Sequence, residues 1–346
     1  VPNVPAGPVT VVVAKPQGEA RWGEHPAITF NKPLITLGDR DSTPPPPIEM
    51  TPKADGAWHW IGSSSVEFVP DHDLPYATTF TVVVKAGLTA IDGEKLAKPY
   101  TYTFDTLRPV IERTEPRDGY PWLAPDSKID VTFNMPMKDV DKHIVVTAGD
   151  VRVPFTAAYV DVRAERAKKN HQPPPPPQQH TPSGMSTTYR IAFASPLKPA
   201  TKITIAVDAS LTGTEGPIPF KGGTFHFEVA GPFQFTGVTP CGSWGERERC
   251  SYGPITLSAT NEPDADSLRG HVHFKPDAVV DDDELSTYAN MSTGARASVS
   301  AKLRPGTKYV VTVDAGVKDV FGQAAPAFTG TFRLDDVEPA LDIDSD

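Results

Sequence analysis

The chain has 346 residues, a net charge of −10 at neutral pH, 38 prolines and 26 glycines. This length suits about three domains of roughly a hundred residues each, and the prolines leave little room for long helices. The acidic residues are dispersed, so we expect no nucleic acid as a partner. No apolar run approaches the roughly 18 residues that cross a bilayer, and no basic start precedes an apolar N-terminal core. Any signal or membrane anchor is therefore expected outside this sequence.

Three strand-like runs of alternating apolar residues each lead into an Asn-x-Pro motif. Proline cannot donate to a sheet ladder, so each predicted strand ends or moves to a sheet edge there. The runs cover residues 27–30, 128–133 and 254–259, and the motifs are Asn31-Lys32-Pro33, Asn134-Met135-Pro136 and Asn261-Glu262-Pro263.

A second signal recurs after each motif, as a short loop that leads into a predicted strand. The loops are Leu74-Pro75-Tyr76-Ala77-Thr78, Leu197-Lys198-Pro199-Ala200-Thr201 and Leu303-Arg304-Pro305-Gly306-Thr307. The strands that follow cover residues 80–84, 203–207 and 309–313. We interpret them as equivalent strands in three copies of one unit.

A third signal is a glycine at the tip of the turn that follows. Gly93, Gly216 and Gly322 occupy this position, and glycine adopts the positive φ that a tight turn requires. Closing strands are predicted over residues 100–106, 223–229 and 328–334.

Three ordered signals in three copies predict an all-β protein of three tandem immunoglobulin-like β-sandwich domains. The boundaries fall near Arg108 and Gly231, which gives modules at 1–107, 108–231 and 232–335. Residues 336–346 form an acidic tail or a linker.

The second unit contains an insertion near residues 163–184 that includes Pro173 to Pro177. Such a composition favours an extended polyproline II chain without a packed core. The segment is either a solvated loop, which we favour, or a docking site for a proline-recognising groove. The same alternatives apply to Pro44 to Pro47.

The two cysteines, Cys241 and Cys250, flank a polar, turn-like segment, so we predict a local disulfide. The alternative is a pair of free thiols in a reducing cytosol. Their spacing fits no strong metal motif.

Local signatures of catalysis are absent from the sequence: there is no Gly-x-Ser-x-Gly elbow, His-Glu-x-x-His helix, phosphate-binding glycine loop or dinucleotide fingerprint. We therefore predict no catalytic, cofactor-binding or metal-binding residue, and no cofactor. Since geometry rather than order defines a catalytic triad, this lowers the expectation of an enzyme without removing it.

Two groups of residues suggest metal sites. His271 and His273 would share one face of a strand and are either the start of a zinc site or a surface pair, which we favour. Asp281, Asp282, Asp283 and Glu284 offer oxygen ligands for calcium, but they lack the spacing of a defined loop, so a solvated acidic loop is the favoured interpretation.

The tryptophans form a further candidate interface. Trp58 and Trp60 alternate on one predicted strand, whereas Trp22, Trp122 and Trp244 each lie in a predicted loop before an Asn-x-Pro strand. The loop tryptophans mark either an interface with a partner or packing against a neighbouring module.

The chain resembles the immunoglobulin-like modules near the N-terminus of bacterial alpha-2-macroglobulins. The resemblance is carried by the first two Asn-x-Pro motifs, by the segment Ala-Gly-Leu-Thr-Ala-Ile-Asp-Gly-Glu at 86–94 and by Tyr102-Thr103-Phe104-Asp105-Thr106 with Arg108-Pro109. It implies a large periplasmic or cell-surface, often lipid-anchored protease trap. Many members carry a Cys-x-Glu-Gln thioester, which neither Cys241 nor Cys250 matches.

The expected function is thus a non-catalytic N-terminal scaffold of a protease inhibitor. Target proteases would be bound by further domains that this sequence lacks, a cell-envelope protein is a second candidate partner, and the membrane would be reached only through an N-terminal anchor that it also lacks. The alternatives are an adhesion or cell-wall module array of a bacterial surface protein and a carbohydrate-binding accessory to an enzyme.

Overall fold

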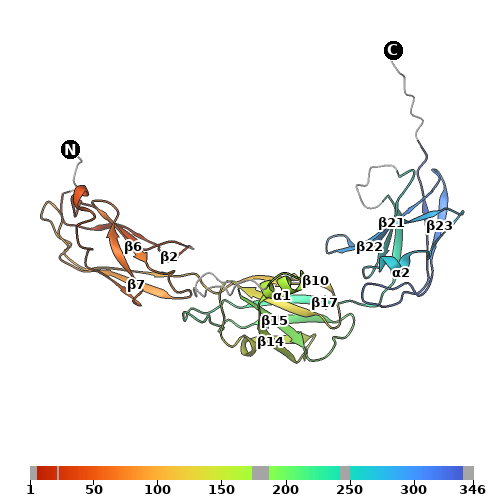
Figure 1. Ribbon diagram of the computed structural model, residues 1–346, viewed down its shortest axis with the longest axis horizontal. Helices are drawn as coiled ribbons and strands as arrows, with labels where there is room; N and C mark the ends of the chain where they lie inside the picture. The colour runs from red at the N-terminus through yellow and green to blue at the C-terminus, as the bar shows by residue number, and fades with distance from the viewer. Residues whose placement is uncertain (1–5, 22, 174–186, 242–249, 338–346) are drawn as a thin grey trace, which may run out of the picture.

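The computed structural model of the protein describes residues 6–21, 23–173, 187–241 and 250–337. Its six sheets form three pairs in chain order, and each pair encloses its own cluster of buried apolar side chains. The pairs, called modules 1, 2 and 3 below, follow one another in a curved row with module 2 in the middle (Figure 1). The predicted all-β architecture is confirmed.

Module 1 consists of two four-stranded sheets around a core that includes Trp58, Trp60 and Phe80. Its sheets, in spatial order, are β1 (Val11–Lys15), β3 (Ala27–Phe30), β6 (Ser65–Pro70) and β5 (Gly56–Trp60), and β2 (Gly18–Glu19), β8 (Tyr100–Asp105), β7 (Thr79–Val84) and β4 (Ile48–Thr51). A short 3-10 helix, η1 (Leu37–Asp39), lies between β3 and β4. Since Trp58 and Trp60 pack inside this core, they form no exposed surface for a partner.

Module 2 pairs a five-stranded sheet with a four-stranded sheet. In spatial order these are β10 (Tyr120–Leu123), β17 (Gly223–Val229), β16 (Lys202–Val207), β12 (Ile144–Ala148) and β13 (Val151–Arg152), and β14 (Phe155–Val160), β15 (Thr187–Phe193), β11 (Lys128–Phe133) and β9 (Ile111–Glu115). The short helix η2 (Val140–His143) precedes β12.

Module 3 pairs a four-stranded sheet with a three-stranded sheet. These are β18 (Phe235–Pro240), β19 (Ile255–Ala259), β22 (Gly294–Ala301) and β21 (Val280–Asn290), and β20 (Val272–Lys275), β23 (Lys308–Val313) and β24 (Phe328–Arg333). One helical turn, α2 (Ala265–Leu268), precedes β20.

The three modules share one strand register, which confirms the repeat predicted from the sequence. The predicted strands of the second and third signals are β7 with β8, β16 with β17, and β23 with β24. Equivalent buried residues face each other across these pairs: Phe80 and Phe104, Ile203 and Phe227, Tyr309 and Phe332. The two aromatic pairs stack, with ring centroids 5.3 and 5.6 Å apart. Burying such a side chain contributes about 1.5–3 kcal/mol.

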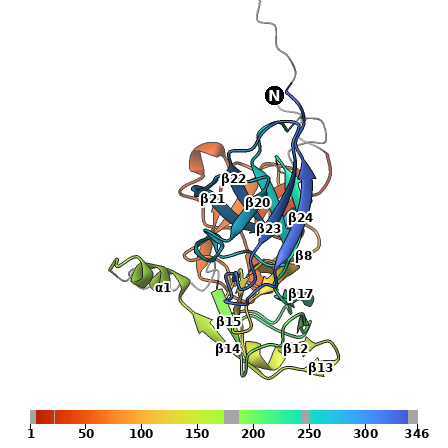
Figure 2. The same ribbon diagram turned by 90° about the vertical axis from the view of Figure 1, so that its right-hand side faces the viewer.

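The insertion in module 2 begins with a helix, so its prediction as extended chain is wrong at this end. Helix α1 (Val162–Lys169) projects from the side of the module (Figure 2). Asp161 caps its N-terminus by accepting hydrogen bonds from the backbone of Arg163 and Ala164, and Glu165 pairs with Arg190 at 2.7 Å. Most of Pro173 to Pro177 lies outside the described residues.

Two smaller predictions are also corrected. Asp281 to Glu284 belong to strand β21 rather than to a loop, and the pairing of β21 with β22 shifts register between Asp281 and Ser286. The Pro44 to Pro47 segment is not simply solvated, because Pro46 is buried and the Pro44 carbonyl accepts a hydrogen bond of 3.1 Å from the Trp60 indole N–H.

Candidate functional site

The chain that leaves each module is held by the loop of the second sequence signal. Ala77, Ala200 and Gly306 occupy the same loop position, and all three adopt a left-handed conformation with φ between 53° and 66°. Their N–H groups donate to Leu107 at 2.9 Å, to Val229 and Ala230 at 3.1 and 3.4 Å, and to Asp335 at 3.0 Å. Because a left-handed alanine is unfavourable by itself, its recurrence indicates that these hydrogen bonds compensate for the strain. We call this contact the outgoing clamp.

The chain that enters each module is held by the asparagine of the Asn-x-Pro motif. In module 2 the side chain of Asn134 donates to the carbonyl of Arg108 and accepts from the N–H of Val110, both at 2.9 Å. In module 1 Asn31 makes the same pair of bonds to Pro8 and Thr10 at 3.1 and 2.8 Å. In module 3 Asn261 donates to Gly231 at 2.8 Å. We call this contact the incoming clamp.

The two clamps act on consecutive residues at both junctions between modules. Leu107 is held by module 1 and Arg108 by module 2, and Ala230 is held by module 2 and Gly231 by module 3. No unclamped residue therefore remains between neighbouring modules. A linker in which every residue is held by one of the two modules restricts the angles that the modules can adopt.

The junction between modules 1 and 2 is further closed by direct backbone contact. The Ile218 N–H donates to the Ala77 carbonyl at 2.8 Å, and Tyr76 and Ala77 are part of the buried cluster of module 2. Gly216 lies against this loop so closely that a Cβ there would overlap the Ala77 carbonyl. Gly216 has no positive φ, so the prediction that it serves as a turn glycine is wrong, and its role is close approach.

Glu215 joins the same contact from module 2. Its Oε2 accepts a hydrogen bond of 2.7 Å from the Tyr76 N–H, whereas its buried Oε1 has no hydrogen-bond partner among the described residues. Burial raises the pKa of Glu215 above its ordinary value, and the hydrogen bond from Tyr76 opposes this effect.

The junction between modules 2 and 3 is built around Trp122. The prediction of a loop position for Trp122 is wrong, since it lies in β10, where its indole N–H donates to the Thr260 carbonyl of module 3 at 2.8 Å. Trp122 therefore packs against a neighbouring module, which is one of the two alternatives given for these tryptophans. Trp22 and Trp244 lie outside the described residues.

The disulfide between Cys241 and Cys250 is present and belongs to module 3. Cys250 also exchanges two backbone contacts with Asp335: its N–H donates to the Asp335 carboxylate and its carbonyl accepts from the Asp335 N–H, both at 2.8 Å. Since Asp335 is the residue held by the outgoing clamp of module 3, the disulfide supports that clamp.

Neither suggested metal site gathers a set of ligands. His271 is bound to the Arg269 carbonyl and His273 to the Asp314 carboxylate at 2.9 Å. Within the described ranges, no group of three or more His, Cys, Asp or Glu side chains is arranged to hold a metal ion.

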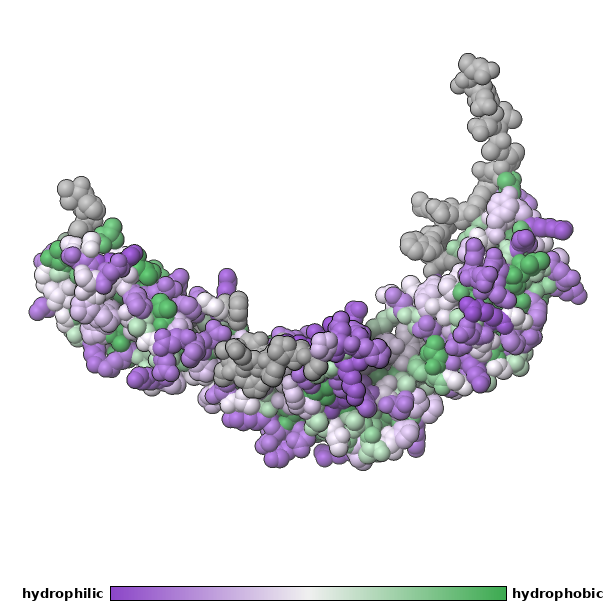
Figure 3. Space-filling model, viewed as in Figure 1, coloured by the Kyte–Doolittle hydropathy of each residue, from purple (hydrophilic) through white to green (hydrophobic). Residues whose placement is uncertain are grey.

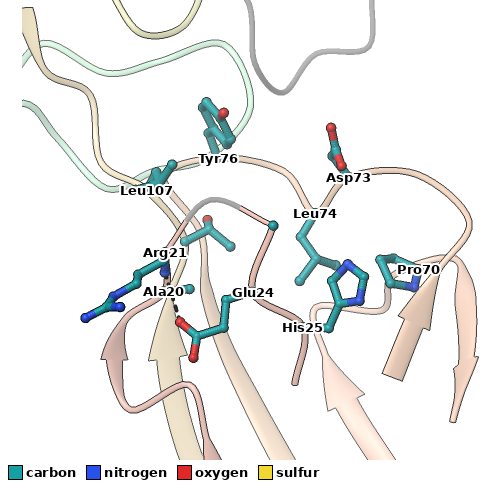
Figure 4. A pocket seen from close by; sticks show the side chains of 11 residues that line it. Ala20, Arg21, Glu24, His25, Pro70, Asp73, Leu74, Tyr76 and Leu107 are labelled. Atoms are coloured by element: carbon teal, nitrogen blue, oxygen red, sulfur yellow. Dashed lines mark hydrogen bonds between the residues drawn. The ribbon is translucent and has the colours of Figure 1, made fainter. Parts of the chain in front are cut away.

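A small depression lies at the end of module 1 that faces module 2 (Figure 4). The polar side chains of Glu24, His25 and Asp73 surround the apolar Leu74 in this depression, and the Arg21 N–H donates to Glu24 at 3.1 Å. It adjoins the Leu74–Thr78 loop and so belongs to the junction.

The visible surface is mainly hydrophilic, with apolar residues in small separate patches (Figure 3). In the described part of the chain, no helix has the length and apolar character needed to span a membrane.

A model of the bacterial Ig-like domain matches residues 7–106 and 105–236, which correspond to modules 1 and 2. The chain belongs to the bacterial Ig-like domain family. It also resembles an alpha-2-macroglobulin homolog of Nostoc sp., with 23% identity over 334 residues that make up 89% of this chain and 17% of that protein. This Ig-like chain thus spans about a sixth of that relative.

The chain is also similar to solved structures of other proteins. The N-terminal part of the bacterial S-layer protein SbsC is 14% identical over 66% of this chain and 45% of that chain, with a TM-score of 0.25. Native alpha-2-macroglobulin from Escherichia coli, in a structure spanning domains MG0-NIE-MG1, is 11% identical over 93% of this chain and 96% of that chain, also with a TM-score of 0.25. Scores of this size do not define how Ig-like modules are arranged here.

The asparagine clamp does not follow from the proline of the Asn-x-Pro motif, which by itself predicts only the end of a strand. The available signal was the asparagine itself, which recurs at the end of the equivalent strand in all three modules. An asparagine side chain has both a donor and an acceptor, so it can form two hydrogen bonds with the backbone of a neighbouring segment.

Proposed function

We propose that this chain is a non-catalytic, stiff spacer in a bacterial alpha-2-macroglobulin-like protease trap of the cell envelope. The observation that carries the proposal is the clamping of consecutive residues at both junctions. Three sandwiches joined without slack hold whatever is attached to them at a defined distance and direction. The spacer role itself requires no catalytic residue.

The similarity to the Nostoc homolog over 89% of this chain supports placing the spacer in a trap. The disulfide supports an exported protein, since disulfides persist in oxidising compartments such as the periplasm and the cell surface. Target proteases would then be bound by other domains of the longer protein, and a lipid anchor would precede the spacer.

An array of adhesion modules on a bacterial surface is the second candidate. The observation that favours it is the same row of clamped modules, because an adhesin also needs reach without chemistry. In that case the modules would bind a partner through their exposed surface, in addition to acting as a stiff spacer.

The test uses the full-length native protein and a variant with a flexible Gly-Ser insertion between Leu107 and Arg108. A trap retains a bound protease that still cleaves small peptides but no longer cleaves large protein substrates. We expect the native protein to protect large substrates in this way and the insertion variant to protect them less. Failure of the native protein to retain protease would reject the trap, and equal protection by the two proteins would reject the role of a stiff spacer.

A further inference from the structure

The same turn position carries a different residue in each module, and the two acidic residues at this position make different contacts. Asp92 in module 1, Glu215 in module 2 and Phe321 in module 3 all precede the third-signal glycine. Asp92 pairs at 2.6 Å with Lys32 of its own module, whose side chain is only 2% exposed.

Module 2 lacks the cation that would pair with its acidic residue. The position equivalent to Lys32 is Met135, whose sulfur fills the space left by Gly213. Glu215 is therefore directed out of its own module and accepts the N–H of Tyr76 in module 1. This contact leaves Oε1 buried without a hydrogen-bond partner in the described chain.

We propose that Glu215 is a proton-sensitive latch between modules 1 and 2, which grips the Tyr76 loop more tightly when the carboxyl is protonated. This inference rests on the proposed spacer function, because it makes one junction of the spacer adjustable. A charged carboxylate with one unpaired buried oxygen is costly, whereas the neutral acid avoids most of that cost and still accepts from Tyr76 through its carbonyl oxygen.

In the described part of the chain, few other ionisable groups lie near Glu215. The elements packed against Glu215 are the Leu74–Thr78 loop and outgoing linker of module 1, and the segment that follows Met135 in module 2. Their titratable residues are Asp73, Tyr76, Arg108 and Lys138. Arg108 is engaged by Glu19 and Asp105 at 3.7 and 3.5 Å, and the pKa of Glu215 is shifted by burial and the Tyr76 N–H rather than by a charged neighbour.

The sign of the pH effect follows from the raised pKa. Burial at the junction raises the pKa of Glu215 above its ordinary value of 4.5, by more than the hydrogen bond from Tyr76 lowers it, so protonation favours the docked junction. The added stability of docking is complete below the ordinary pKa and is lost as the pH rises through the raised pKa. A pKa difference of one between docked and undocked Glu215 corresponds to about a tenfold change in the docking equilibrium.

The experiment uses pulsed electron paramagnetic resonance to measure distances between nitroxide labels on modules 1 and 2 of the whole 346-residue chain. The labels are attached at Lys53→Cys and Lys202→Cys, both exposed positions, with the native disulfide left intact. We expect the distance distribution to be narrow near pH 4 and to broaden towards about pH 8. Glu215→Gln should remain narrow throughout, because the amide mimics the neutral acid.

The matched control is Glu94→Gln, which removes an exposed carboxylate just after the equivalent turn of module 1 and should behave like the unmodified chain. A distribution that stays narrow at every pH would overturn the latch and leave the stiff spacer standing. A broadening that persists in Glu215→Gln would also overturn it. A distribution that is broad at every pH in all variants would reject the spacer as well.

Discussion

The carbonyl of Ala77 in module 1 accepts a hydrogen bond of 2.8 Å from the N–H of Ile218 in module 2. Ala77 thereby serves both sides of the junction, because its own N–H holds Leu107 in the outgoing clamp. One left-handed residue thus couples the end of one sandwich to the loop of the next. The close approach of Gly216 makes this arrangement possible.

Gly216→Ala should undock modules 1 and 2 without unfolding either. The added Cβ would overlap backbone atoms of Tyr76 and Ala77, which cannot move without breaking the outgoing clamp. We expect the label distances between the two modules to broaden, whereas each module keeps its own thermal transition. Gly62→Ala is the control, since Gly62 also lacks a positive φ and has open space around its Cβ position. An undisturbed distance distribution in Gly216→Ala would contradict the described junction.

Asn134→Ala should weaken the incoming clamp of module 2. Two hydrogen bonds are lost, each of which contributes about 0.5–1.5 kcal/mol. The total loss is about 1–3 kcal/mol, so at about 4 °C per kcal/mol for a module of this size we expect the calorimetric transition temperature of module 2 to fall by about 4–12 °C. Asn170→Ala, at the exposed C-terminal end of helix α1, should leave the transition in place. Equal behaviour of the two variants would show that the asparagine clamp contributes little.

The buried pair of Lys32 and Asp92 should respond asymmetrically to substitution. Lys32→Met copies the residue that module 2 has at this position and leaves Asp92, whose side chain is 38% exposed, free to hydrate. Asp92→Asn instead leaves a buried ammonium without its counter-charge, which is the costlier defect. We expect Asp92→Asn to lower the temperature of the calorimetric transition of module 1 by more than Lys32→Met does. The reverse order would contradict the burial of the lysine.

Acid should destabilise module 1 through the same pair. The hydrogen bond from Lys32 holds the pKa of Asp92 below its ordinary value of 3.8. The stabilisation is therefore present above the ordinary pKa and is lost as the pH falls through the lowered pKa. Calorimetry of module 1 in increasingly acidic buffers should show this loss in the natural chain and a smaller one in Asp92→Asn. The direction is opposite to that expected for Glu215, so the two effects are separable.

Reduction of the disulfide should affect module 3 alone. Closing the short loop between Cys241 and Cys250 stabilises by about 2–3 kcal/mol in the chain-entropy model. With a reductant, the calorimetric transition of module 3 should fall, whereas those of modules 1 and 2 should not move. The double variant Cys241→Ser with Cys250→Ser should reproduce the loss without reductant. A lower transition temperature of module 1 or 2 after reduction would contradict the prediction that the disulfide stabilises module 3 alone.

Much of the fold follows from local sequence because the strands are short, alternate in polarity and end at proline or glycine. The strands after Leu74, Leu197 and Leu303 were predictable for this reason, and so was the disulfide. Helix α1 was missed because its polar, basic residues lack an apolar face, and the Asp161 cap and the Glu165–Arg190 pair hold it in place. The clamps were missed since they join residues far apart in sequence, such as Asn134 and Arg108.

The three modules form one stiff, curved body, because consecutive residues are clamped at both junctions between them. Small-angle X-ray scattering from the 346-residue chain in acidic buffer tests this most directly. We predict that the scattering curve fits a single elongated, curved particle with the arrangement in Figure 1. A curve that can be fitted only by modules reorienting independently of one another would contradict the account.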